Sequence, residues 1–145
     1  MAATQSILME VDSKLANTRL VAMAVRGLCA ITTLSPVEIN RLELCLVEVV
    51  NNAIEHAYGN KAGHRVEILV ELEETQLSIT ISDWGAVMPG KNLEVRELKL
   101  IDPELPETVL CSGRGLHIVR NLMDALEYSS HQGKNSLLMV KQLRH

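Results

Sequence analysis

A carboxylate and an amide lie one helical turn apart in the stretch from Glu43 to Asn60, which reads ELCLVEVVNNAIEHAYGN. At about 100° per residue, Glu48, Asn52 and Glu55 fall on one side of a predicted helix and the apolar residues fall on the other. A carboxylate can take a proton from a nucleophile, and an amide oxygen is a neutral ligand for a hard cation such as Mg²⁺. A solvated polar face would show the same spacing, so this helix alone leaves both interpretations open.

A second candidate residue is a carboxylate at the end of a predicted strand. Asp83 follows an apolar stretch and precedes Trp84 and Gly85. Such a carboxylate can accept a hydrogen bond from an exocyclic amine, while the glycine lets a ligand approach the backbone. An ordinary turn at the end of a strand has the same residues.

A third candidate is the segment Ser112-Gly113-Arg114-Gly115, which opens a predicted helix. Glycines before a helix leave backbone N–H groups free to bind phosphate, and the positive end of the helix dipole adds to this. The segment is neither a Walker A loop nor a GxGxxG fingerprint. A flexible hinge is the alternative interpretation.

The first part of the chain predicts a strand and a helix. An apolar stretch at residues 7–11 predicts an edge strand. The helix that follows is predicted to be capped by Asp12 or Ser13 and to run to about Ile31. Its predicted apolar stripe consists of Leu20, Ala24, Leu28 and Ile31.

The second helix has a strong start signal. Ser35 at the N-cap, Pro36 at the first helical position and Glu38 at the third form a predicted capping box. This helix carries the carboxylate and amide described above and is expected to end near Gly59 and Asn60. Its apolar stripe consists of Leu42, Leu46, Val49, Val50, Ala53 and Ala57.

The rest of the chain predicts more strands, a long connection and a third helix. Four strands are predicted, at residues 65–74, 76–85, 126–131 and 136–143. Residues 86–111 hold three of the four prolines and show no periodicity, and connections of this length are usually lids or disordered. The glycines that follow favour a lid. The helix covers residues 116–126, and Gly133 turns the last strand pair. The whole predicts one α+β domain over residues 1–145, a two-layer α/β sandwich whose helices cover one face of a mostly antiparallel sheet.

Composition limits the classes of function. The net charge of −4 disagrees with direct nucleic-acid binding, which needs a concentrated basic surface. No apolar run approaches the roughly 18 residues of a membrane span, and the N-terminus lacks the pattern of a signal peptide. The cysteines, Cys29, Cys45 and Cys111, have no metal-binding spacing. They indicate reduced, partly buried thiols in a cytosolic protein.

In this order the motifs resemble those of the GHKL, or Bergerat-fold, ATPases. Residues 48–53, EVVNNA, resemble the N-box of that superfamily; residues 83–85, DWG, resemble its first glycine box and residues 113–116, GRGL, its second. From end to end the chain is similar to the small anti-sigma factor serine/threonine kinases of bacterial partner-switching systems. Residues 112–124, SGRGLHIVRNLMD, match the helix that follows the lid in those proteins.

The resemblance implies a role for each matching residue. Glu48 would be the general base for the hydroxyl of an acceptor serine, and Asn52 would hold Mg²⁺ against the triphosphate of ATP. Asp83 would read the adenine amine, with Gly85 beside the ring. Ser136 would stand where the family often has a threonine near the adenine. The residues implied at the nucleotide from the lid end are Ser112, Gly113, Arg114, Gly115 and Leu116.

The function implied is that of a cytoplasmic anti-sigma factor with serine-kinase activity. Such a protein would bind Mg-ATP, phosphorylate a serine on a STAS-type anti-sigma factor antagonist and sequester a sigma factor. The phosphate adds about two negative charges and would break docking of the antagonist. The resemblance also implies a homodimer. The alternative is a non-catalytic ATP-binding module that sequesters a regulatory partner, and a third interpretation is a stable fold without a ligand. The presence of Glu48 favours the kinase.

Overall fold

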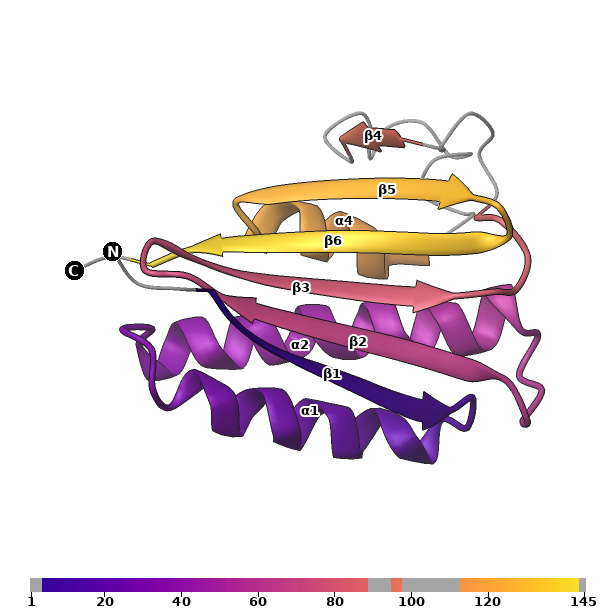
Figure 1. Ribbon diagram of the computed structural model, residues 1–145, viewed down its shortest axis with the longest axis horizontal. Helices are drawn as coiled ribbons and strands as arrows, with labels where there is room; N and C mark the ends of the chain where they lie inside the picture. Colours follow the sequence, from indigo (N-terminus) through magenta and orange to yellow (C-terminus); the bar gives the residue numbers. More distant parts are fainter. Residues whose placement is uncertain (1–3, 89–94, 98–112, 144–145) are drawn as a thin grey trace.

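The computed structural model describes residues 4–88, 95–97 and 113–143, with only the backbone described for 95–97 and 113–117. Its strands form a sheet in the order β1-β2-β3-β6-β5-β4, and all five neighbouring pairs are antiparallel. The strands are β1 (Gln5–Asp12), β2 (Arg65–Leu72), β3 (Gln76–Asp83), β4 (Val95–Glu97), β5 (Ala125–His131) and β6 (Lys134–Gln142). The helices are α1 (Ala16–Cys29), α2 (Pro36–Asn52), the π-helical turn η1 (Ala53–Ala57) and α4 (Gly113–Leu122). They lie on one side of the sheet (Figure 1), which confirms the predicted α+β sandwich.

Helix α2 begins where the capping box predicts. The backbone N–H of Glu38 donates to Ser35 Oγ at 3.1 Å, and the N–H of Ser35 donates to Glu38 Oε1 at 2.9 Å. Pro36 occupies the first turn, where its missing N–H costs nothing. The buried face of α2 is Leu42, Cys45, Leu46, Val49 and Val50, which agrees with the predicted stripe.

Helix α1 corrects two predictions. Its N-cap is Leu15, which makes no capping bond through its side chain; neither Asp12 nor Ser13 caps it. The predicted stripe is wrong for Leu20, which is 64% exposed, and for Ile31, which lies beyond the end of α1 and is 70% exposed, whereas Leu28 packs against the core. The residues that α1 buries are instead Thr18, Val21, Ala22, Val25 and Cys29. Exposed apolar residues thus follow helical spacing on the outer side of α1, parallel to the buried set.

The strand pairs lie close to their predicted positions. The register of β2 and β3 pairs Leu72 with Leu77 around a short hairpin, and β1 pairs with β2 at the sheet edge. Strands β5 and β6 are joined through Gln132 and Gly133, whose φ angles are 52° and 84°. Two successive positive φ angles are those of a tight hairpin turn, which a glycine adopts without strain.

The second half of the chain departs from prediction in two places. Helix α4 ends at Leu122, earlier than predicted, because the backbone N–H of Asp124 already donates to Val140 O at 2.9 Å. Strand β4, which pairs with β5, falls inside the stretch expected to be a lid without regular structure. Most of that stretch, 86–111, lies outside the described residues, as does Ser112.

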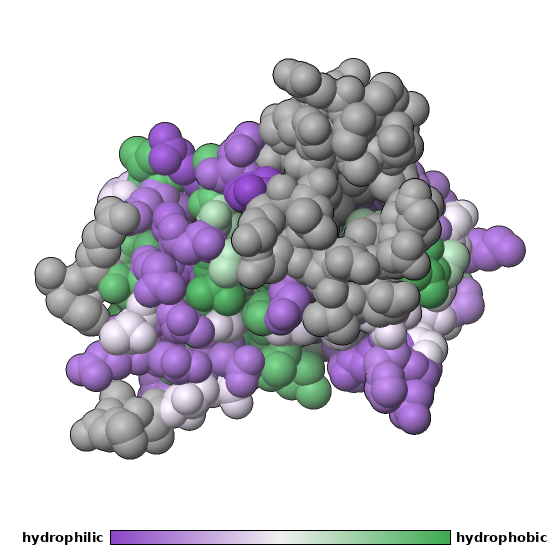
Figure 2. Space-filling model, turned by 90° about the horizontal axis from the view of Figure 1, so that it is seen from above, coloured by the Kyte–Doolittle hydropathy of each residue, from purple (hydrophilic) through white to green (hydrophobic). Residues whose placement is uncertain are grey.

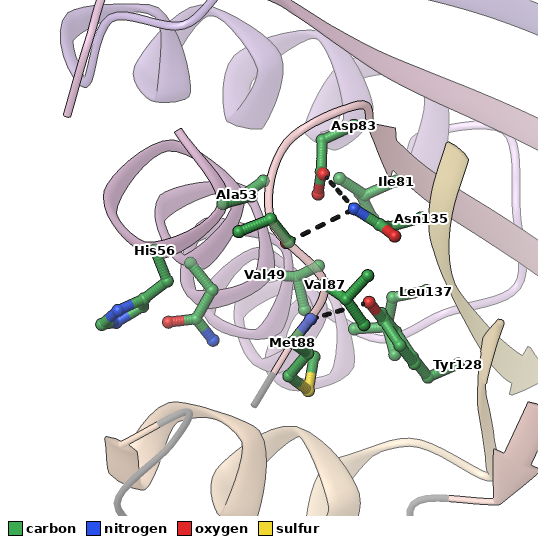
Figure 3. A pocket seen from close by; sticks show the side chains of 13 residues that line it. Val49, Ala53, His56, Ile81, Asp83, Val87, Met88, Tyr128, Asn135 and Leu137 are labelled. Carbon is green, nitrogen blue, oxygen red and sulfur yellow. Dashed lines mark hydrogen bonds between the residues drawn. The ribbon is translucent and has the colours of Figure 1, made fainter. Parts of the chain in front are cut away.

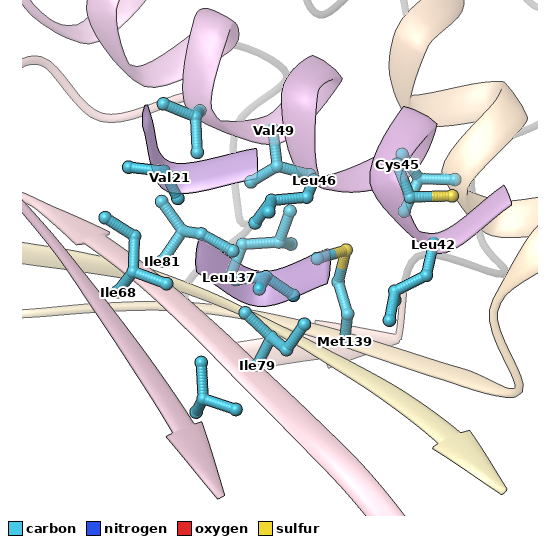
Figure 4. Packing of buried hydrophobic residues seen from close by; sticks show 14 of the residues in the cluster. Val21, Leu42, Cys45, Leu46, Val49, Ile68, Ile79, Ile81, Leu137 and Met139 are labelled. Carbon is cyan, nitrogen blue, oxygen red and sulfur yellow. The ribbon is translucent and has the colours of Figure 1, made fainter. Parts of the chain in front are cut away.

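The core lies between the helices and the sheet (Figure 4). In that view Leu42, Leu46 and Val49 of α2 point toward Ile79 of β3 and Met139 of β6. All five side chains are at most 4% exposed. Burying an aliphatic side chain of this size stabilises the fold by about 1.5–3 kcal/mol. This packing fixes α2, and therefore its polar residues, relative to the ends of β3 and β6.

The outer surface is mixed in character. On the face seen in Figure 2, hydrophilic side chains cover much of the described surface, and hydrophobic side chains appear between them. Cys29 and Cys45 are buried and free. Among the described residues, no helix is long and apolar enough to cross a membrane.

Replacing the N-cap of α2 tests the start of this helix. We expect Ser35→Ala to lower the free energy of unfolding by about 0.5–2 kcal/mol, because the N–H of Glu38 loses its acceptor. Chemical denaturation of both proteins measures the difference. Val37→Ala, at an exposed position of the same turn, serves as the control. Equal loss in the two variants would show that the capping box contributes nothing specific.

Candidate functional site

A pocket opens where the C-terminal end of α2 meets the ends of β3 and β6 (Figure 3). Three segments far apart in the sequence build it: the α2–η1 region, the end of β3 with the residues after it, and the β5–β6 pair. Its lining residues are Val49, Asn52, Ala53, His56, Ala57, Ile81, Asp83, Ala86, Val87, Met88, Tyr128, Asn135 and Leu137. Most of this wall is apolar, and Asp83, Asn52 and Asn135 are its convergent polar groups, as in small-molecule sites.

Asp83 is the buried carboxylate of this pocket. It is 9% exposed, and its Oδ1 accepts hydrogen bonds from Asn135 Nδ2 at 2.8 Å and from the N–H of Gly85 at 3.0 Å. Burial raises the pKa of this carboxyl above 3.8, and the two hydrogen bonds lower it in part. Both bonds fall on one oxygen, so Oδ2 can accept a donor from a ligand.

Asn135 is a site residue that the sequence did not reveal. It lies on β6 on the helix-covered face, is 2% exposed, and lines the pocket. Strand alternation turns its neighbour Ser136 to the other face, where Ser136 Oγ is 2.8 Å from Ser82 Oγ. Ser136 is therefore not among the described residues that line the pocket, whereas its neighbour Asn135 is. The alternation of strand residues could have identified Asn135, because it lies two and four residues before Leu137 and Met139, which face the core.

Asn52 lines the pocket beside Val49 and Ala53 of the apolar stripe. Its Nδ2 is buried and has no hydrogen-bond partner among the described residues. An unpartnered buried amide costs about 1–3 kcal/mol, so its retention calls for an explanation such as a bound ligand. The interpretation as a solvated polar face does not hold for Asn52.

Glu48 and Glu55 are half-buried, and neither is among the described residues that line the pocket. Glu48 lies one turn after the buried thiol of Cys45 and contributes to the pKa of that thiol. Burial raises the pKa of Cys45 to about 12, and the negative charge of Glu48 contributes to this rise. The helix face that carries Glu48 and Asn52 is thus divided, with only Asn52 turned into the pocket.

The C-terminal end of α2 widens into a π-helical turn where it borders the pocket. The N–H of Tyr58 donates to Ala53 O at 3.2 Å, five residues earlier, in place of the usual four. Ala57 O is then free to accept the N–H of Ala86 at 2.8 Å. Single π turns inside α-helices are frequent at functional sites. A regular helix ending at Gly59 and Asn60, as predicted, misses this turn.

Gly85 lies against that turn. A Cβ added to Gly85 would lie 2.2 Å from Ala57 O and 2.6 Å from Ala57 C, closer than atoms can approach. The glycine is therefore required by a contact between backbones, of the strand-end loop and of the helix. This is a different reason from the predicted approach of a ligand.

The two tyrosines of the chain fasten the segment that leaves β3. The hydroxyl of Tyr58 accepts the N–H of Trp84 at 2.7 Å and donates to Arg65 O. On the other side of the pocket the hydroxyl of Tyr128 accepts the N–H of Met88 at 3.0 Å. Residues 84–88 are thereby held at both ends, and the pocket wall they form is fixed.

Trp84 lies next to Asp83 in sequence but packs with charged side chains of the sheet. The guanidinium carbon of Arg65 lies 4.0 Å from the centre of its ring, and Lys134 Nζ lies 5.5 Å from it. Glu67 forms ion pairs with both cations, at 3.7 and 3.8 Å. A cation over an indole face is attracted by about 0.5–1 kcal/mol at exposed sites.

The predicted second glycine box forms the first turn of α4. The backbone of Gly113, Arg114, Gly115 and Leu116 is helical, and α4 packs against α2. The side chains of Arg114 and Leu116 lie outside the described residues. Within the described part of the chain, no group of three or more His, Cys, Asp or Glu side chains could hold a metal ion.

Comparison with known proteins identifies this architecture. Residues 11–141 match the family described as "Histidine kinase-like ATPase domain". The chain belongs to this family. A protein named "Anti-sigma F factor" from Clostridium beijerinckii is 30% identical over 133 residues, which are 92% of this chain and 90% of that protein. One of the same name from Oceanobacillus iheyensis is 34% identical over 116 residues, 78% of this chain and 77% of that protein.

A solved structure supports the fold alone. The crystal structure of the RsbU and RsbW domains of Rv1364c from Mycobacterium tuberculosis aligns with a TM-score of 0.67 at 16% sequence identity. The alignment covers 99% of this chain and 34% of that chain. The predicted resemblance to anti-sigma factors of the histidine kinase-like ATPase family is confirmed, and membership implies nucleotide binding.

A matched pair of glycine variants tests the contact between Gly85 and the π turn. We expect Gly85→Ala to lower the free energy of unfolding by about 1–3 kcal/mol, because the new methyl meets backbone atoms that cannot rotate away. Gly27→Ala, in α1, has nothing within 4 Å of its Cβ position. It should raise the free energy of unfolding by about 0.5–1 kcal/mol through helix propensity.

Denaturant titration of both variants measures the two changes. A Gly85→Ala protein as stable as Gly27→Ala would contradict the close contact.

Proposed function

We propose that this protein binds Mg-ATP in the pocket, transfers the γ-phosphoryl group to a serine of an anti-sigma factor antagonist, and sequesters a sigma factor. The observation that carries the proposal is that the buried, hydrogen-bonded Asp83 and Asn52, whose Nδ2 is buried without a partner among the described residues, line one apolar pocket of a histidine kinase-like ATPase. The relatives' name, "Anti-sigma F factor", supports the sigma factor as partner.

Asp83 and the apolar wall are suited to an adenine ring. Asp83 Oδ2 presents only an acceptor, which fits the exocyclic amine of adenine and not the carbonyl oxygen that guanine has at the same place. Ile81, Leu137 and Val49 supply apolar surface around that acceptor. Because Asp83 is buried and hydrogen-bonded, its carboxylate is held in one orientation before the base binds.

Asn52 is suited to the metal that accompanies the triphosphate. Its Nδ2 has no hydrogen-bond partner within the described part of the chain. Its Oδ1 is a neutral oxygen, and one such oxygen together with phosphate oxygens matches the ligands that Mg²⁺ prefers. When bound, Mg²⁺ would neutralise the charge on the phosphates, which is a main requirement of phosphoryl transfer. Gly113, Arg114, Gly115 and Leu116, at the start of α4, with Ser112 before them, are proposed to contact the phosphates through the helix N-terminus.

Glu48 is proposed to act as general base toward the acceptor serine. It lies one turn before Asn52, and a base positions and deprotonates the attacking hydroxyl. Its place outside the described pocket lining favours a second candidate function, a non-catalytic ATP-binding module that sequesters its partner. In that case the carboxylate of Glu48 would be a polar surface group of α2 without a catalytic role.

Removing the Asn52 amide tests the metal site. We expect Asn52→Ala to lose the Mg²⁺ dependence of its ATP affinity, because this helix turn then offers no oxygen to the metal. Calorimetry with and without Mg²⁺ measures the effect. Asn51→Ala is the matched control, since Asn51 Oδ1 accepts from Thr18 Oγ1 at 2.7 Å and serves the packing of α1 on α2. Unchanged Mg²⁺ dependence in Asn52→Ala would remove Asn52 from the site.

Glu48→Gln separates the two candidate functions. If Glu48 is the base, we expect single-turnover phosphorylation of the antagonist to slow by about 10²–10⁴-fold while ATP affinity stays within a factor of two of wild type. Glu55→Gln is the control, because Glu55 is also half-buried and outside the pocket lining. Melting temperatures of both variants show whether folding is affected.

Wild-type protein that binds ATP and antagonist without transferring phosphate would support the non-catalytic module. A Glu48→Gln protein with full transfer rate would assign the base to another residue.

A further inference from the structure

We propose that Asn135 is the positioning residue that sets base selectivity in the pocket, by fixing Asp83 and the loop after β3 with a single amide. This inference rests on the proposed nucleotide binding and names the residue that would make the binding selective for adenine, whose amine lies where guanine has a carbonyl oxygen.

Hydrogen bonds to both Oδ1 and Nδ2 fix the orientation of the Asn135 side-chain amide. Ser130 Oγ donates to Asn135 Oδ1 at 2.6 Å, so the oxygen faces β5 and the nitrogen faces Asp83. Nδ2 then donates to Asp83 Oδ1 at 2.8 Å and to Gly85 O at 3.0 Å, with Ala86 O at 3.4 Å. The opposite orientation would place the amide oxygen against a carboxylate and two carbonyls, which only accept hydrogen bonds.

This arrangement determines which group Asp83 offers to a base. Because Asn135 Nδ2 and the N–H of Gly85 occupy Oδ1, Oδ2 is left as the acceptor that faces a ligand. The same hydrogen bonds favour the ionised carboxylate, against the burial that raises the pKa of Asp83. An ionised acceptor rejects a base that presents a carbonyl oxygen, since two acceptors face each other without a proton.

Asn135 also joins this acceptor to the chain that leaves β3. Its bonds to Gly85 O and Ala86 O hold the loop whose N–H groups are used by Asp83 Oδ1 and Ala57 O. A shift of the amide therefore moves both the carboxylate and the pocket wall. The residue acts through its neighbours and has no chemical step of its own.

Aspartate is the sharpest replacement because it keeps the size of asparagine and reverses the polarity of one group. At neutral pH, Asn135→Asp would place two carboxylates in hydrogen-bond contact, and one of them would bind a proton with a strongly raised pKa. Within the described residues, the titratable groups near Asp83 are Tyr58 from the end of η1 and Tyr128 from β5, both with raised pKa, and His56 on the pocket wall. Wild type and Asn135→Asp share all three residues, so the introduced carboxylate is the titratable group that distinguishes the two proteins.

We expect Asn135→Asp to bind ATP at least about tenfold more weakly than wild type at pH 8, the effect of losing one charge-assisted hydrogen bond. The affinity should recover as the pH falls, because a shared proton restores a donor toward Asp83. Protonation of Asp83 can only weaken binding to wild type, so wild-type affinity should not rise as the pH falls, and the rise is specific to the variant. The ratio of ATP to GTP affinity should fall in the variant at pH 8.

Calorimetry of the full chain with ATP and GTP measures the ATP affinity and the ratio of ATP to GTP affinity. The measurements run from about pH 5.5 to about pH 8, the range in which a carboxyl with a strongly raised pKa titrates. Ser130→Ala is the second variant, because it removes the donor to Asn135 Oδ1 and so loosens the amide without adding charge. It should lower the ATP to GTP ratio with little change in pH profile, and it decides the matter if Asn135→Asp does not fold. Ser136→Ala, on the other face of β6, is the control that should change neither.

Folded variants with the wild-type selectivity and the wild-type pH profile would overturn this inference alone. Wild-type protein that binds no nucleotide would overturn the proposed function and this inference together. Wild-type protein that binds ATP selectively but transfers no phosphate would overturn the kinase proposal and leave the role of Asn135 intact.

Discussion

The contact between two backbones at Gly85 and Ala57 is the constraint on which the site depends. The N–H of Ala86 reaches Ala57 O at 2.8 Å, and the space for a side chain at Gly85 is filled by the helix end. This contact joins the helical layer to the end of β3 at the place where the two layers would otherwise part. Asp83, Asn52 and the apolar wall can converge on one pocket because the two layers are held at this distance.

The local signals in the sequence were sufficient for the parts of the fold that depend on neighbouring residues. The capping box of Ser35, Pro36 and Glu38 fixes the start of α2, and alternation fixes the strand pairs. Where two patterns compete, periodicity does not choose between them. Helix α1 has apolar residues at helical spacing on two faces, and burial is decided by which face meets the sheet. That depends on residues of β2 and α2 remote in sequence.

Residues of the candidate site that belong to a sequence motif could be predicted. Residues whose role depends on which face of a strand they lie on were harder to predict. Asn52 and Asp83 line the pocket, whereas Ser136 lies on the other face of β6 and its neighbour Asn135 lines the pocket. The choice between adjacent strand residues is a choice of face, which shifts completely with a change of one residue in register. The π turn has no local signal either, because it goes together with the bond from the N–H of Ala86 to Ala57 O, between residues 29 positions apart in the sequence.

The chain has one tryptophan, and it sits directly after the buried carboxylate. The indole of Trp84 lies 4.0 Å from a guanidinium, while its backbone N–H is held by Tyr58. Indole emission responds to nearby charge, so we expect a rearrangement of the Asp83–Gly85 segment to change the fluorescence spectrum. The protein therefore carries an intrinsic optical reporter beside its pocket, and ligand titrations can be followed without attaching a dye.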